Sequence, residues 1–207
     1  MKEEYQAIVI GGGAMGAGLL YHLAHEGWSD LLLIEKGELT SGSTWHAAGL
    51  VPHFIGSLNM AKVHATAPKL YAELEEETGL SAGWHSTGAI RLALSENEVD
   101  WFRYVNGMLS LVGVESHLIS PTEILDHHPL LDISDVKLGF WTPNDGWSDP
   151  TSSTNAMAKG ARQLGVTIER KWQADSYEWT GKEWKVTLAK MVEKGGINFQ
   201  EIVTRIN

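Results

Sequence analysis

The sequence predicts an α/β fold in which two domains alternate along the chain. Residues 7–35 have the pattern of a strand, a glycine-rich turn, a helix and a second strand. Residues 166–204 have the pattern of one further buried strand followed by three strands of a meander. We therefore expect residues 1–50 and 151–207 to form one three-layer domain with a parallel sheet. The segment 51–150 is expected to be part of a second, antiparallel α+β domain.

The first of these patterns begins with a short apolar run. Residues 7–10 are apolar throughout, which is typical of a strand buried in a parallel sheet. A helix is predicted over 17–26, because its leucines recur on one face and Gly27 follows as a stop signal. The run 31–34 is a second buried strand that ends at Glu35. Together these elements have the size of a βαβ unit.

The rest of the chain alternates helix and strand signals. Ser95 with Glu98 forms a capping box, and Ser120 with Pro121 is a second helix start. Asp149 caps another predicted helix, which reaches Gln163. The remaining predictions are a helical region over 58–79 that bends or restarts at Pro68, and strands at 88–94, 136–142, 166–170, 172–179, 184–191 and 197–204.

Composition restricts the classes of function. The chain has 207 residues, a formal net charge of -10 and no cysteine. Such an acidic chain repels phosphate backbones, so we expect no nucleic-acid partner. The lack of cysteine excludes disulfides and thiolate catalysis within this sequence. The N-terminus lacks a secretory or transit pattern, and glycines interrupt the apolar stretch 7–24, so we expect a cytoplasmic protein without a membrane partner.

The glycine-rich turn carries the first chemical signal. Gly11 permits the tight turn after the strand, Gly13 lets the backbone approach a pyrophosphate, and Gly16 lets the helix pack closely on the strand. The helix N-terminus, with Ala14 and Met15, presents backbone N–H groups to phosphate oxygens. An unrelated glycine-rich turn is the alternative. The flanking strands and helix favour a dinucleotide site.

Glu35 and the residues after it narrow the choice of dinucleotide. A carboxylate at this strand end accepts hydrogen bonds from ribose hydroxyls and repels a 2′-phosphate, which disfavours NADP. Otherwise Glu35 is only an exposed charge, and Lys36 beside it either contacts the cofactor or is merely exposed.

The segment Ser43–Leu50 is rich in small and hydroxyl residues and contains His46. An ordinary helix is more usual here in NAD enzymes, so the segment favours a flavin.

In these motifs the chain resembles the dimethylglycine and sarcosine dehydrogenase branch of the D-amino-acid-oxidase-like flavoproteins. The most specific part of the resemblance is the sequence Thr44-Trp45-His46-Ala47-Ala48-Gly49-Leu50, which points more to dimethylglycine than to sarcosine dehydrogenases. The other motifs that carry the resemblance are Gly11, Gly13, Gly16 and Glu35, then Lys69-Leu70-Tyr71, Leu74–Gly79, Gly88–Ala93, and Asp145-Gly146 with Asp149-Pro150.

The resemblance implies a Rossmann-like FAD-binding domain and a role for His46. In this family the corresponding histidine is joined covalently to the 8α carbon of the flavin. A histidine packed beside a noncovalent flavin is the alternative. Trp45 either stacks near the flavin, lines an amine pocket or simply packs. The cofactor-binding residues implied are Gly11, Gly13, Ala14, Met15, Gly16, Glu35, Lys36, Ser43, Thr44, Trp45, His46, Ala47, Ala48, Gly49, Leu50 and Ala174, the last at the adenine.

The function implied is oxidation of the N-methyl group of dimethylglycine, or of sarcosine, by hydride transfer to FAD. The iminium product then passes its one-carbon unit to tetrahydrofolate, bound in a downstream domain, or to water. Electrons pass to oxygen or to an electron-transfer flavoprotein. A noncatalytic regulatory flavoprotein and an NAD-binding dehydrogenase are the alternatives.

The sequence also predicts what residues 1–207 lack. No catalytic base is evident in residues 1–207, and the pair His127-His128 lacks the spacing of a metal site. The abrupt end after a strand indicates a truncated, incomplete fold. Because the first strand then has an unpaired edge, we expect this segment alone to be poorly soluble, to hold flavin weakly and to be inactive.

Overall fold

The computed structural model describes residues 1–191 and 197–205 and has the predicted α/β fold. The chain forms two compact units. The first unit contains Met1–Ala48, Glu73–Gly83 and Asp149–Asn207. The second unit contains Gly49–Ala72 and Trp84–Ser148.

A parallel sheet lies at the centre of the first unit. Its strands are β2 (Ala7–Ile10), β3 (Leu31–Glu35) and β10 (Thr167–Arg170), in the order β10-β3-β2. Both neighbouring pairs are parallel. The apolar side chains of β3, Leu31 to Ile34, are fully buried. The predicted βαβ unit and third strand are thus confirmed, and the apolar run of β3 reflects its central position.

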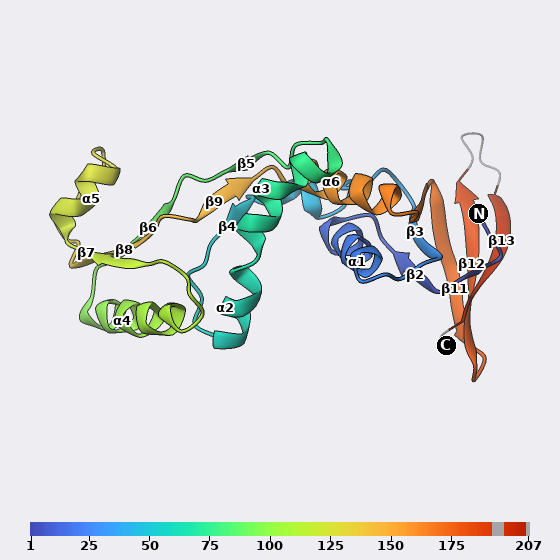
Figure 1. Cartoon of the computed structure of the whole chain (residues 1–207), viewed down its shortest axis with the longest axis horizontal. Helices are drawn as coiled ribbons and strands as arrows, with labels where there is room; N and C mark the ends of the chain where they lie inside the picture. Colours follow the sequence, from blue (N-terminus) through green and yellow to red (C-terminus); the bar gives the residue numbers. More distant parts are fainter. Residues whose placement is uncertain (192–196, 206–207) are drawn as a thin grey trace. The chain divides into compact units, whose positions relative to one another are not determined.

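Two helices pack beside this sheet. In Figure 1, α1 (Ala14–His25) and α6 (Pro150–Gln163) lie side by side next to β2 and β3. Gly160 of α6 allows this close approach, because a Cβ there would lie 2.8 Å from the Tyr21 ring of α1. The Asp149 carboxylate accepts a hydrogen bond from the Ser152 N–H at 2.7 Å, which confirms the predicted cap. Hydrogen bonding from the Ser152 side chain, and then from its backbone, lowers the pKa of Asp149.

The predicted meander forms a second sheet in the first unit. The strands β11 (Trp172–Trp179), β12 (Glu183–Met191) and β13 (Ile197–Arg205) pair antiparallel in sequence order. A two-residue strand that the sequence did not predict, β1 (Glu4–Tyr5), adds to β13 in parallel. Tyr5 joins buried side chains of β12 and β3 in one hydrophobic core, so the meander packs against the parallel sheet.

The end of α3 (Ala67–Thr78) also packs in the first unit, although its sequence lies within the predicted middle segment. The buried Tyr21 hydroxyl donates a hydrogen bond to the Glu77 carboxylate, which also contacts His25 Nε2 at 2.9 Å. Burial first, and then the Glu77 carboxylate, raise the pKa of Tyr21. These side-chain contacts attach α3 to α1, and periodicity in the sequence does not reveal them.

The second unit contains two small antiparallel sheets. One has the order β4-β9-β5, with β4 at Leu50–Val51, β9 at Gly146–Ser148 and β5 at Trp84–His85. The other has the order β6-β8-β7 and includes the two strands that the sequence predicted in this region. Its bounds are β6 at Ala89–Ala93, β8 at Leu138–Thr142 and β7 at His117–Ile119.

Three further helices belong to the second unit. They are α2 (Leu58–His64), α4 (Glu96–Ser110) and α5 (Pro121–His127). Both predicted helix starts form complete capping boxes. Backbone N–H groups of Leu94 and Ser95, with the Ser95 hydroxyl, hold the pKa of Glu98 below its usual range. The inner face of α4 packs on Phe140 of β8 in the main core of the unit.

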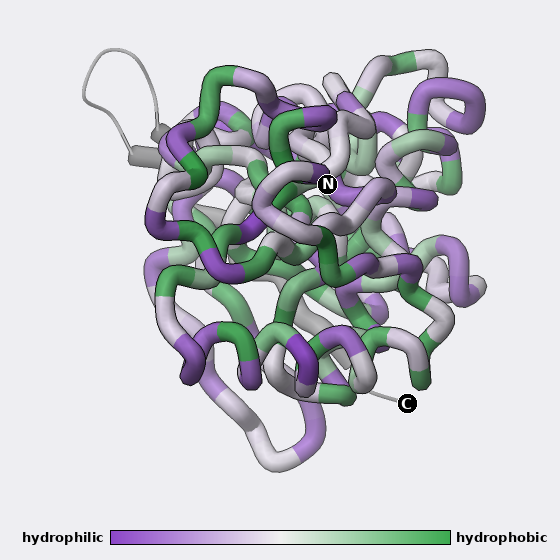
Figure 2. The backbone as a smooth tube through the Cα atoms, turned by 90° about the vertical axis from the view of Figure 1, so that its left-hand side faces the viewer, coloured by the Kyte–Doolittle hydropathy of each residue, from purple (hydrophilic) through white to green (hydrophobic). Residues whose placement is uncertain are grey.

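Hydropathy varies over short distances along the chain. Figure 2 shows hydrophilic and hydrophobic stretches alternating at short intervals on the backbone. Within residues 1–191 and 197–205, no helix combines the length and apolarity needed to cross a membrane.

Candidate cofactor site

Two adjoining cavities lie at the carboxyl ends of β2 and β3. One, of about 340 Å³, extends toward Ala174 on β11, and the other, of about 580 Å³, extends along the glycine-rich turn toward Thr44. Gly11, Glu35 and Lys36 line both cavities. The carboxyl edge of a parallel sheet is where such folds bind their ligands, so these shared residues mark the centre of the candidate site.

The glycine-rich turn is held in place by close backbone packing. Gly11 has a φ of +112°, which favours glycine. A Cβ on Gly16 would lie 2.0 Å from the carbonyl oxygen of Gly11, so only glycine allows α1 to begin this close to β2. A Cβ on Gly13 would lie 2.9 Å from Thr44 Oγ1. The structure thus shows Gly16 as a packing residue, whereas Gly13, Ala14 and Met15 line the larger cavity.

The Glu35 carboxylate is fixed by the backbone around it. Oε2 accepts a hydrogen bond from the Gly12 N–H at 2.7 Å, and Oε1 accepts one from the Gly37 N–H at 2.6 Å. Each carboxylate oxygen has a second lone pair, so both still have acceptor capacity for a ligand hydroxyl. Glu35 therefore offers acceptor atoms and negative charge to both cavities.

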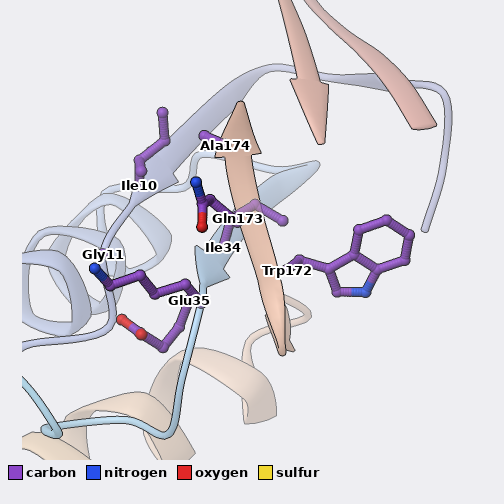
Figure 3. Close-up of a pocket in the computed structure, with 8 residues that line it drawn as sticks. Ile10, Gly11, Ile34, Glu35, Trp172, Gln173 and Ala174 are labelled. Carbon is purple, nitrogen blue, oxygen red and sulfur yellow. The ribbon is translucent and has the colours of Figure 1, made fainter. Parts of the chain in front are cut away.

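The smaller cavity is also lined by residues that sequence reasoning missed, which are Ile10, Ile34, Trp172 and Gln173. Trp172 and Gln173 line it together with Ala174, the residue assigned to the adenine. Figure 3 shows the Gln173 side chain on the side of β11 that faces Gly11, while the Trp172 ring extends to the other side. Trp172 and Gln173 are neighbours on β11, so their side chains point to opposite faces of the strand, and Trp172 shares its face with Ala174.

An ion-pair group borders the parallel sheet. Glu38 contacts Lys171 Nζ at 2.8 Å and also pairs with Arg170 at the end of β10. The hydrogen bond from Lys171 is the main cause of the lowered pKa of Glu38. These contacts join the loop after β3 to the end of β10.

The predicted attachment segment is tied to the glycine-rich turn at its start. Thr44–His46 form a single 3-10 turn, η1. Thr44 Oγ1 accepts a hydrogen bond from the Ala14 N–H at 3.0 Å, and the Thr40 N–H donates to the Gly12 carbonyl at 3.0 Å. A hydroxyl from a distant part of the chain thus caps the N-terminus of α1, whose own N-cap Gly13 has no side chain to do so.

His46 and Trp45 are exposed. The Trp45 side chain is 58% exposed, and its ring centroid lies 3.8 Å from that of His46. His46 Nδ1 lies 3.2 Å from the Gly42 carbonyl oxygen. Trp45 to Ala48 line neither cavity, and Gly49 and Leu50 belong to the second unit. Of the predicted segment, only Ser43 and Thr44 line the larger cavity.

The residues present fit a dinucleotide. The N-terminus of α1 supplies N–H groups and a positive dipole end for phosphates, glycines leave room for backbone approach, and Glu35 supplies ribose acceptors. Among the residues that the structure describes, no group of three or more histidine, aspartate or glutamate side chains is arranged to hold a metal ion.

Comparison with known proteins identifies the family. The family model described as FAD dependent oxidoreductase matches residues 6–203. The chain belongs to this family. This match confirms the resemblance drawn from the sequence.

The chain is also similar to individual proteins, of which two are described below. The chain is 45% identical to human mitochondrial dimethylglycine dehydrogenase over 168 residues, which are 81% of this chain and 19% of that protein. It is 36% identical to the mouse mitochondrial pyruvate dehydrogenase phosphatase regulatory subunit over 168 residues, again 81% of this chain and 19% of that protein. This chain thus spans about a fifth of the length of these relatives.

A solved structure supports the fold. L-proline dehydrogenase from P. horikoshii aligns with a TM-score of 0.86 and 29% identity, covering 100% of this chain and 52% of that one.

Proposed function

We propose that this chain is part of an FAD-dependent enzyme that oxidises the N-methyl group of dimethylglycine. The observation that carries the proposal is the pair of cavities around Glu35, found in a chain of the FAD dependent oxidoreductase family. The 45% identity to a dimethylglycine dehydrogenase supports this substrate. Sarcosine is the alternative substrate. The family match favours FAD over NAD.

The residues around the cavities would hold FAD in two parts. Gln173 and Ala174 would receive the adenosine, Glu35 the ribose hydroxyls, and the N-terminus of α1 the diphosphate. FAD, when bound, supplies the acceptor for the hydride that leaves the N-methyl carbon. The chain contributes binding, orientation and, through His46, retention of the cofactor.

The exposed His46 is suited to covalent attachment. If Nδ1–H donates to the Gly42 carbonyl, Nε2 keeps its lone pair and is the nitrogen that can form a bond. The proposed bond joins Nε2 to the 8α carbon of the flavin. FAD, when bound, would supply the 8α methyl carbon and accept two electrons as one C–H bond of that methyl group gives way to the bond to Nε2, and the proton would leave to solvent.

Acid precipitation tests the attachment. The full-length protein is precipitated with acid, and the visible flavin absorbance of the pellet is measured for the unchanged chain and for His46→Ala. We expect the yellow colour in the pellet of the first and in the supernatant of the second. His22→Ala, another exposed histidine, is the matched control and should retain its flavin. Colour lost entirely to the supernatant from the unchanged protein would contradict the covalent bond.

A noncatalytic flavoprotein is the second candidate, because the chain is 36% identical to a regulatory subunit. Anaerobic mixing with dimethylglycine and with sarcosine separates the two candidates. Loss of the oxidised flavin spectrum supports the enzyme. Flavin that binds normally but stays oxidised with both amines supports the regulatory protein.

The further steps of the proposal concern the rest of a longer protein. The iminium would transfer its one-carbon unit to tetrahydrofolate or to water, and the electrons would pass to oxygen or to an electron-transfer flavoprotein. Formaldehyde release measured with and without tetrahydrofolate tests the first step, and oxygen consumption tests the second. The relatives are named mitochondrial. The cytoplasmic location stays a prediction, which cell fractionation tests.

A further inference from the structure

The smaller cavity contains one side-chain amide that the protein itself does not use. Gln173 lies on β11, and Figure 3 shows its amide group on the side of that strand toward Gly11. The residue is exposed, and its amide has no hydrogen-bond partner in the part of the chain that the structure describes. Folding therefore does not depend on this amide, and its donors and its acceptor oxygen are available to a ligand.

The other polar side chains around this cavity are restricted to one role in a hydrogen bond. The Glu35 carboxylate only accepts, whereas the Lys36 ammonium and the Trp172 indole only donate. The remaining side chains are apolar, namely Ile10, Ile34 and Ala174. Of the side chains that line this cavity in the described part of the chain, Gln173 alone presents a donor and an acceptor side by side.

The apolar part of the cavity suits a flat ring. Ile10 and Ile34 are partners in the parallel sheet, yet Ile10 is 53% exposed and Ile34 only 1%. The exposed Ile10 side chain offers an apolar surface to the face of an aromatic ring. An apolar wall with a single donor–acceptor pair is suited to a planar base that carries both kinds of group on one edge.

Adenine has such an edge. Its 6-amino group donates hydrogen bonds, and the ring nitrogens N1 and N7 on either side of that group accept them. A glutamine amide pairs with adenine through two hydrogen bonds when proteins recognise this base in DNA. The adenosine end of FAD is also the end assigned to this cavity, because Thr44, two residues before the proposed anchor His46, lines the larger one.

We propose that the Gln173 side chain is the group that selects adenine in the FAD site, a role that rests on the proposed function. Its Oε1 accepts a hydrogen bond from the 6-amino group, and its Nε2–H donates one to the neighbouring ring nitrogen. Ala174, the residue assigned to the adenine from the sequence, has no polar atom in its side chain. That side chain therefore cannot read the edge of the base.

Nucleotide binding tests this role in the full-length protein. A His46→Ala background allows the flavin to be removed, and titration calorimetry then compares ADP with purine riboside 5′-diphosphate, which lacks the 6-amino group. With Gln173 in place, we expect ADP to bind about tenfold more tightly than the purine nucleotide, because one hydrogen bond distinguishes them. Gln173→Leu removes both the donor and the acceptor. It should bind ADP about tenfold more weakly and the two nucleotides about equally.

Two controls make the result specific to adenine. Ser176→Ala changes another exposed residue of β11 that lines neither cavity, and it should keep the tenfold preference for ADP. FMN, which has no adenine, should bind Gln173→Leu as tightly as it binds the protein with Gln173. An equal loss of FMN and ADP affinity in Gln173→Leu would overturn the adenine-specific role.

The remaining outcomes separate this inference from the proposed function. Equal affinities of the two nucleotides for the protein with Gln173 would overturn this inference alone, and that measurement needs no change at Gln173. A preference for ADP that persists in Gln173→Leu would do the same, because another group would then hold the 6-amino group. A full-length protein that binds neither FAD nor ADP would instead overturn the proposed function and with it the role of Gln173.

Discussion

The glycine-rich turn and the attachment segment Ser43–Leu50 meet at one cavity, but the chain supports them differently. The turn is enclosed by backbone, with Gly16 against Gly11 and the Glu35 carboxylate held by two N–H groups. The attachment segment is tied down at Thr44, whereas Trp45 and the residues that follow it are largely exposed. Protein packing alone therefore fixes the first region, while the side chains of the second remain available to a ligand.

The largest effect should come from adding one carbon at Gly16. In Gly16→Ala the new Cβ meets a backbone oxygen that cannot rotate away, which we expect to lower the free energy of unfolding by about 3 kcal/mol or more. This exceeds the roughly 1 kcal/mol that alanine gains over glycine in a helix. Urea denaturation measures the change. Gly42→Ala, immediately before the attachment segment, is the control, because nothing lies within 4 Å of the added carbon. Equal stability of the two variants would remove the distinction between the regions.

A smaller effect is expected at Glu35. Glu35→Gln replaces one acceptor oxygen by an NH₂ group, so either the Gly12 or the Gly37 N–H loses its partner, at a cost of about 1–2 kcal/mol. Urea denaturation with and without added FAD should show lower stability and a smaller stabilisation by FAD. Glu3→Gln, on the exposed N-terminus, is the control. Unchanged FAD stabilisation in Glu35→Gln would remove Glu35 from the ribose site.

Loss of the hydrogen bond between Ala14 and Thr44, which joins the two regions, should have a smaller effect on stability again. Thr44→Val removes the acceptor of the Ala14 N–H, and loss of such a cap costs about 1 kcal/mol. Amide hydrogen exchange at Ala14 should quicken, while Thr44→Ser, which keeps the hydroxyl, should retain most of the protection. Equal exchange in both variants would mean that Thr44 does not hold the segment to α1.

The smallest effect should come from the exposed part of the attachment segment. Trp45→Ala removes a ring that is 58% exposed and rests on His46, so we expect a change within about 0.5 kcal/mol in urea denaturation. Leu20→Ala, a fully buried position of α1, is the contrasting variant and should cost about 2–5 kcal/mol. A loss above 1 kcal/mol at Trp45 would show that this segment supports the fold.

The parts of the fold with local signals were predictable from the sequence. The parallel strands have apolar runs, both capping boxes follow the Ser-x-x-Glu pattern, and Asp149 precedes a proline at a helix start. The two-residue strands β1, β4 and β5 carry no periodicity, because pairing with distant strands alone defines them. Likewise, the position of the end of α3 depends on Glu77 meeting Tyr21, fifty-six residues away in sequence.

In the candidate site too, only the residues that belong to a local sequence pattern were predictable. The glycine motif and Glu35 were located because their spacing reflects backbone geometry that many dinucleotide sites share. Gln173 and Trp172 were missed because a strand residue becomes a lining residue only through the placement of β11 beside β3. Thr44 was expected to contact the cofactor, but its bond to Ala14 follows from folding rather than from any pattern in the sequence.

The two N–H groups that hold Glu35 also affect the thermodynamics of cofactor capture. A free glutamate side chain loses about 1.5–2 kcal/mol of rotamer entropy when it is immobilised. In this protein the Gly12 and Gly37 N–H groups immobilise the Glu35 side chain during folding. The rotamer entropy is therefore lost on folding and not again when a ribose binds. Shortening the side chain in Glu35→Asp would keep the charge but lose this arrangement. Weaker binding in that variant should appear mainly as a less favourable entropy in titration calorimetry.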